Sequence, residues 1–147
     1  MAATPQQAVK DAIKTAGSER DLKFRDAIHL PFHQVGMSEN LPEIYLSEAD
    51  VPEYRDSDWE TSKPEWVGST VKLLSMEKII GDTKKVAFLI EACRYKADGT
   101  LLQTFNAIVT VSSMNGDWRL ISRNPFNVGK ALLTGTLGWC LAANSLD

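Results

Sequence analysis

The chain has 147 residues, a formal net charge of −3 and a pI near 5.4, with 44% hydrophobic and 24% charged residues. This length and composition fit one globular domain with a sizeable core. The acidic balance and the lack of a lysine–arginine cluster exclude nucleic acid as an expected partner.

The longest apolar stretch, 128–143, contains Lys130 and three glycines. It is shorter than the about 20 residues of a membrane span, so we expect no membrane partner. The two cysteines, Cys93 and Cys140, make no disulfide framework, and their spacing fits no metal motif. We therefore expect no metal and no cofactor. The N-terminal segment lacks the apolar core of a signal peptide, which favours a cytoplasmic location.

The first predicted element is a helix that begins after Thr4. The Thr4 hydroxyl can cap the free N–H groups, Pro5 suits the first helical position, and Gln7 can complete a capping box. Gly17 is the expected end of this helix. The apolar residues at helical spacing are Ala8, Val9, Ala12, Ile13 and Ala16.

A second helix is predicted from Ser18, which can act as its cap. It should end at or before Leu30, because the residue before Pro31 avoids helical geometry. Two short strands, 32–37 and 43–46, should follow, joined by a turn at 38–42.

The region 48–60 is the most acidic part of the chain and includes a predicted short helix at 50–55. Such a charge run is typical of a solvated loop or helix surface. The alternative is a loop at the mouth of a pocket, because Tyr54, Trp59 and Trp66 lie among or near the charges, and exposed loops seldom carry such rings without a role.

Strands are predicted at 68–80, 86–95, 101–113 and 118–123, with turns at 81–82, 97–99 and 115–116. Pro125 should stop the last strand. We expect 86–126 to form the curved wall of a cone-shaped domain. The segment 127–147 is predicted to be an apolar tail that packs on the domain, on a dimer partner, or over the pocket mouth with Trp139 as its anchor.

This order of elements, with AIHLPFHQV (27–35), RYKADGTL (94–101) and NGDWRLISR (115–123), resembles the NTF2-like superfamily. Within it, the chain is most similar to the SnoaL-like and ketosteroid-isomerase-like proteins. The resemblance covers roughly 5–126 and implies one α+β domain, 1–126, with a cystatin-like curved antiparallel sheet wrapped by N-terminal helices. The superfamily includes isomerases, dehydratases, cyclases and epoxide hydrolases beside binding and scaffold proteins, so this fold does not fix an activity.

The resemblance to the isomerase branch points to Glu91, which lies eight positions before Gly99. There, a protonated carboxyl group in an apolar site donates a hydrogen bond to a developing enolate. The alternative is that Glu91 faces outward, because strand alternation places Val86, Phe88 and Ile90 on the opposite face. A bulge in the strand would reverse that orientation.

Two features disfavour ketosteroid isomerisation: the first helix has no tyrosine and the first strand has no carboxylate where the isomerases have them. His29 and His33 are alternative proton carriers, because related dehydratases use histidines and imidazole titrates near neutral pH. Each histidine also has a structural interpretation, at a helix end for His29 and on a half-exposed strand for His33.

The candidate ligand-binding residues combine aromatic rings with polar groups. Asn106 would be a buried amide that needs partners if it points inward, and Arg94 and Arg123 would either neutralise an anionic ligand or be solvated at strand ends. The full set of candidate substrate-binding residues is Tyr54, Trp59, Trp66, Arg94, Asn106 and Trp118.

The sequence therefore favours a SnoaL-like protein with a pocket for a small apolar or aromatic molecule. One interpretation is an isomerase or lyase that works by acid–base chemistry without a metal. The alternative is a non-catalytic ligand-binding or dimeric accessory protein. In either case we expect a homodimer through the outer face of the sheet, where Ala87, Leu89 and Cys93 would lie if Phe88 faces inward.

Overall fold

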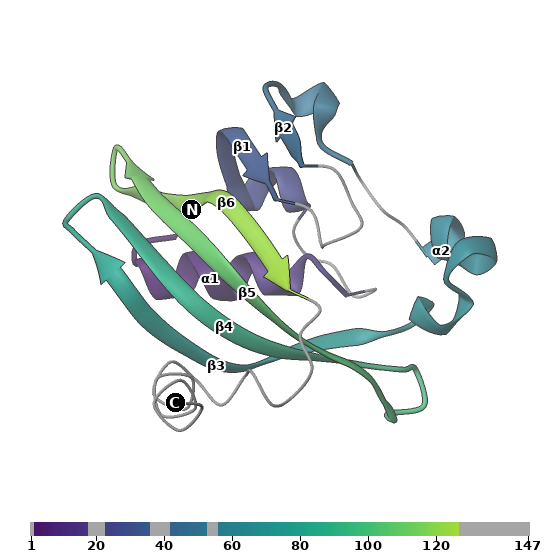
Figure 1. Ribbon diagram of the computed structural model, residues 1–147. Coiled ribbons are helices and arrows are strands. Elements are labelled where there is room, and N and C mark those ends of the chain that lie inside the picture. Colours follow the sequence, from purple (N-terminus) through teal and green to yellow (C-terminus); the bar gives the residue numbers. More distant parts are fainter. Residues whose placement is uncertain (1, 18–22, 36–41, 53–55, 127–147) are drawn as a thin grey trace, which may run out of the picture.

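The computed structural model describes residues 2–17, 23–35, 42–52 and 56–126. It contains a six-stranded sheet of order β2-β1-β6-β5-β4-β3, with helix α1 lying across one face (Figure 1). The helices are α1 (Pro5–Lys14) and α2 (Asp56–Ser62), with 3₁₀ turns η1 (Phe24–Ala27), η2 (Glu48–Asp50) and η3 (Pro64–Trp66). The strands are β1 (Ile28–Gln34), β2 (Glu43–Tyr45), β3 (Thr70–Gly81), β4 (Lys85–Tyr95), β5 (Leu101–Met114) and β6 (Asp117–Phe126).

Helix α1 begins as its sequence predicts. The Thr4 hydroxyl accepts a hydrogen bond from the Gln7 backbone N–H at 3.1 Å, and Pro5 occupies the first turn. The Gln7 side chain, however, donates to Asp11 at 2.8 Å, one turn further along, rather than reaching back to the cap. The helix ends at Lys14, earlier than Gly17.

The predicted second helix is wrong in its second half. Residues 24–27 form a 3₁₀ turn, and Ile28–Gln34 is strand β1, which pairs antiparallel with β2 and parallel with β6. Pro31 lies inside this strand after a cis peptide bond, where the pairing with β6 shifts between Ile28 and His33. The extended geometry that proline imposes on Leu30 therefore continues the strand instead of ending a helix.

The acidic region forms a helix, but later than predicted. A 3₁₀ turn covers 48–50 and α2 covers 56–62, whereas the predicted helix was at 50–55. Residues 53–55, with Tyr54, lie outside the described residues. So do residues 18–22 of the predicted second helix, residues 38–41 of the predicted turn at 38–42, and the tail at 127–147.

The long antiparallel meander is confirmed. Asn115 and Gly116 form a two-residue hairpin with φ angles of 53° and 80°, and Gly99 has a φ of 88° in the preceding turn. Pro125 does not stop β6, which continues to Phe126. Proline is tolerated there because the pairing of β6 with β1 already ends at Arg123, so no partner strand needs its missing N–H on that side.

The core lies between α1 and the sheet. On β4, Val86, Phe88 and Ile90 are buried in alternation, and their neighbours Val109 and Val111 on β5 are buried with them. We call this the inner face of the sheet. Val9 of α1 packs into the same cluster, so this end of the cone is filled by side chains. No helix of the described residues is long and apolar enough to cross a bilayer.

Candidate functional site

The inner face changes character along β4. The same alternation that buries Val86, Phe88 and Ile90 continues through Ala92 to Arg94, because the pairing of β4 with β5 is regular from Lys85 to Arg94. The inward row of apolar side chains therefore ends in a cation. Arg94 is only 4% exposed, so the alternative of a solvated strand-end arginine is wrong.

Arg94 lies in a cluster with two tryptophans and a buried serine. Its Nη1 donates a hydrogen bond to the Ser69 hydroxyl at 2.9 Å, and Ser69 is fully buried. The guanidinium carbon lies 3.8 Å from the ring centroid of Trp66 and 5.6 Å from that of Trp59. The two rings meet edge to face, with centroids 5.5 Å apart. Such cation–π contacts gain strength where water is excluded.

A hollow of about 160 Å³ adjoins this cluster, between the C-terminal end of α1 and the start of β3. It is next to the Arg94 cluster because Thr70 follows Ser69 and Val71 pairs with Arg94 on the same face. A cavity of about 150 Å³ is known to hold one benzene ring. The hollow is lined by Ile13, Lys14, Gly17, Thr70 and Val71.

A second hollow of about 60 Å³ lies at the other end of α1, beside Trp118, Asp26 and Arg119. Since one water takes about 30 Å³ of liquid volume, this space suits water rather than an organic ligand. Trp118 packs against the core, and its backbone N–H donates to the Ala2 carbonyl oxygen at 2.9 Å. Trp118 is thus placed away from the Arg94 cluster.

Glu91 and Asn106 lie on the outer face of the sheet, away from α1. They are direct cross-strand partners, and no bulge interrupts β4 to turn Glu91 inward. Glu91 is half-buried, whereas Asn106 is 4% exposed. The two residues are therefore brought together, but not with the tryptophans or Arg94.

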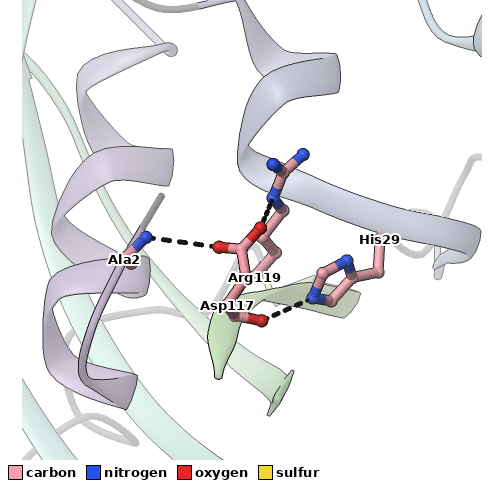
Figure 2. Close-up of polar contacts among 4 residues, drawn as sticks. All are labelled: Ala2, His29, Asp117 and Arg119. Carbon is pink, nitrogen blue, oxygen red and sulfur yellow. Dashed lines mark hydrogen bonds and ion pairs between the residues drawn. The ribbon is translucent and has the colours of Figure 1, made fainter. Parts of the chain in front are cut away.

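The histidines do not converge with Glu91. His29 begins β1 rather than ending a helix, and its Nε2 donates to the Asp117 carbonyl oxygen at 2.8 Å (Figure 2). The Asp117 carboxylate accepts from Arg119 Nε at 2.8 Å and from the Ala2 backbone N–H at 3.3 Å. His33 is exposed on the same strand. No cluster of His, Cys, Asp and Glu in the described ranges is arranged to hold a metal ion.

Arg123 belongs to a different part of the inner face. Its Nε donates to Gln34 Oε1 at 2.8 Å, and its guanidinium lies 4.6 Å from the Phe24 ring centroid. Ser69 could not be singled out from the sequence, because a lone serine before a strand carries no pattern. Its only signal is the preceding Gly68, whose φ of 71° favours glycine.

No family model matches the chain, and no curated protein does. Among solved structures, a protein from Catenulispora acidiphila in complex with S-DNPA superposes with a TM-score of 0.58 at 14% identity, covering 82% of this chain and 88% of that one. A cystatin-like protein from Caulobacter vibrioides gives 0.54 at 13% identity, covering 90% of each chain. An NTF2-like protein with a cystatin-like fold from Novosphingobium aromaticivorans gives 0.51 at 10% identity, covering 97% and 80%. The chain thus has the α+β cystatin-like, NTF2-like fold that the resemblance to this superfamily implied.

Proposed function

We propose that the protein binds a small aromatic acid, with the ring in the hollow between α1 and β3 and the acidic group facing Lys14. The observation that carries this proposal is the position of a ring-sized hollow beside the cluster of Arg94, Trp59 and Trp66. The Catenulispora acidiphila protein of the same fold is itself in complex with S-DNPA.

The lining of the hollow supports this class of ligand. Ile13 and Val71 offer apolar surface to a ring, while Thr70 and Lys14 offer polar groups at the edge. The hollow has a positive charge at its edge from Lys14 on α1, and a second lies nearby on Arg94 of β4, the cross-strand partner of the lining residue Val71. A carboxylate is favoured beside Lys14, and because this lysine is exposed and screened by water, the contact should contribute about 1 kcal/mol.

A binding role is favoured over acid–base catalysis by the positions of the proton carriers. Glu91 lies on the outer face, His33 is exposed, and His29 Nε2 is held by a backbone carbonyl. None of these groups lies among the residues that line the hollow. Proton transfer requires hydrogen-bond reach of the substrate, directly or through one water.

Titration of the ¹⁵N-labelled full chain with benzoate, followed by amide chemical shifts, tests this function. We expect millimolar binding, with the largest shifts at Gly17, Thr70 and Val71. Lys14→Gln should raise the benzoate Kd about three- to tenfold, as loss of one partly exposed charge contact implies. Lys10→Gln is the matched control, because Lys10 lies one turn earlier on α1 and does not line the hollow.

Benzyl alcohol distinguishes the ring from the charge. Benzyl alcohol has the ring without the charge, so its Kd should be higher than that of benzoate but equal in Lys14→Gln and in the unmodified chain. Val71→Phe should abolish binding of both probes by filling the hollow. Absence of shifts at Gly17, Thr70 and Val71, or equal effects of Lys14→Gln and Lys10→Gln, would overturn the proposal.

A further inference from the structure

The outer face of β4 and β5 forms a patch of its own. In Figure 1, α1 lies behind the sheet, and the described chain places no helix over this face. The patch is mostly apolar or weakly polar and has a single charged side chain, Glu91, near its centre. We define the outer patch as Ala87, Leu89, Glu91 and Cys93 of β4 with Thr104, Asn106, Ile108 and Thr110 of β5.

Two residues of the outer patch have the burial of core residues. Cys93 is 5% exposed and Asn106 is 4% exposed. The Asn106 side-chain oxygen is buried, yet no group in the described part of the chain donates a hydrogen bond to it. An unsatisfied buried acceptor costs about 1–3 kcal/mol, so this oxygen calls for a donor from outside the described residues.

The chain itself supplies a candidate occupant. The described chain ends at Phe126, which is the cross-strand neighbour of Asn106 and lies on the same outer face. Residues 127–147 follow directly and carry only two charged side chains, Lys130 and Asp147. The apolar side chains of this tail include Val128, Leu132, Leu133, Leu137, Trp139 and Leu141.

The distances fit a pairing of Lys130 with Glu91. Phe126, Asn106 and Glu91 are opposite one another on three adjacent strands. Strands lie about 4.8 Å apart, so the backbone of Glu91 is about 10 Å from that of Phe126. Lys130 comes four residues after Phe126, and an extended chain of that length spans about 13 Å. The tail's lysine can therefore reach the patch's carboxylate.

We propose that residues 127–147 fold back across the outer patch of their own chain, with Lys130 paired to Glu91 and the tail's leucines over Cys93 and Leu89. The single positive charge near the start of an otherwise apolar segment matches the single negative charge in the patch. A tail in this position also brings backbone N–H groups within reach of the Asn106 side-chain oxygen. This inference concerns the face opposite the proposed ligand site and does not depend on it.

Reactivity of the Cys93 thiol tests this docking in the full chain. In a Cys140→Ser background, Cys93 is the one remaining thiol, and its rate with Ellman's reagent reports how often the patch is uncovered. We expect slow reaction in this parent. Lys130→Glu should raise the rate about tenfold or more by placing a like charge against Glu91, and Glu91→Lys combined with Lys130→Glu should return it to near the parental value. Lys84→Glu, the same charge change in the exposed β3–β4 turn, should leave the rate unchanged.

Trp139→Asp gives a second test within the tail, outside the described domain, and should likewise expose Cys93 while the far-UV circular dichroism is retained. Equal rates in the parent, Lys130→Glu and Trp139→Asp would overturn the proposal, as would failure of the charge swap to restore protection. Protection that appears only at concentrations where sedimentation detects dimers would mean that a second copy covers the patch, which also overturns it.

Discussion

His29 Nε2 donates a hydrogen bond to the carbonyl oxygen of Asp117 across 2.8 Å, and this contact ties the start of β1 to the start of β6. The Asp117 carboxylate completes the arrangement by accepting from Ala2 and Arg119 (Figure 2). One residue thus joins the N-terminal segment, β1 and β6.

Asp117→Ala should lower the free energy of unfolding by about 2 kcal/mol, because it leaves the Ala2 N–H and the Arg119 guanidinium without their acceptor. Arg119→Gln should cost less, at most about 1 kcal/mol, since the Arg119 side chain is 31% exposed. His29→Ala removes one hydrogen bond and should cost about 1 kcal/mol. Urea titration followed by circular dichroism measures all three, and a loss in Asp117→Ala no larger than in Arg119→Gln would contradict the assigned role.

Ser69→Ala should destabilise the protein by about 2 kcal/mol. The Ser69 hydroxyl accepts a charge-assisted hydrogen bond from Arg94, and both residues are buried, so the cation loses an acceptor that water cannot easily replace. Ser75→Ala, on the strand that follows Ser69 but exposed, is the control and should change stability by less than about 0.5 kcal/mol. Equal midpoints for the two variants in a thermal melt would count against the assigned role of Ser69.

Gly116→Ala should cost about 1–2 kcal/mol, because Gly116 has a φ of 80° and a side chain there is strained. The cost is one of backbone conformation alone, since an added Cβ would meet no atom within 4 Å. Gly116→Asn should lose less, because asparagine tolerates the left-handed region better than alanine. We expect the unfolding midpoint to be highest with glycine, lower with asparagine and lowest with alanine at position 116. An alanine variant more stable than the asparagine variant would be inconsistent with this turn.

Acid should weaken two turns at the ends of β4. The Thr100 hydroxyl and N–H lower the pKa of Asp98, and the N–H groups of Lys84 and Lys85 lower the pKa of Asp82. The stabilisation that these two carboxylates give to the folded state is complete above their unfolded pKa of about 3.9. It is lost as the pH falls through their lower folded pKa. Stability measured from pH 6 to 2 should therefore fall less steeply in Asp98→Asn and Asp82→Asn than in the unmodified chain. Parallel pH profiles would argue against these turn contacts.

The meander was predictable because its signals are local. Asn115-Gly116 and Asp98-Gly99 favour left-handed backbone at defined positions, and the strands between them alternate over many residues. Strand β1 was not predictable in the same way. Ile28–Leu30 is a short run with a polar residue, His29, at its centre, and its extended state depends on pairing with β6 far along the chain.

The positions of the candidate site residues could be predicted from the sequence only in part. Alternation predicts that Glu91 and Phe88 lie on opposite faces, but it does not predict which face packs on α1 or whether a bulge intervenes. Arg94 follows the same alternation, yet its burial depends on Ser69 and the tryptophans, which come from another segment of the chain. Sequence periodicity contains no information on such distant partners.

The sheet order has a consequence for how the protein forms during synthesis. Strand β1 reaches the rest of the sheet only through β6, as in the pairing of Ile28 with Leu120. At about 5–20 residues per second, a ribosome needs on the order of ten seconds to make the segment between them. Through that interval β1 and β2 have no completed sheet to join, so the nascent N-terminal third is the part of the chain most exposed to chaperones.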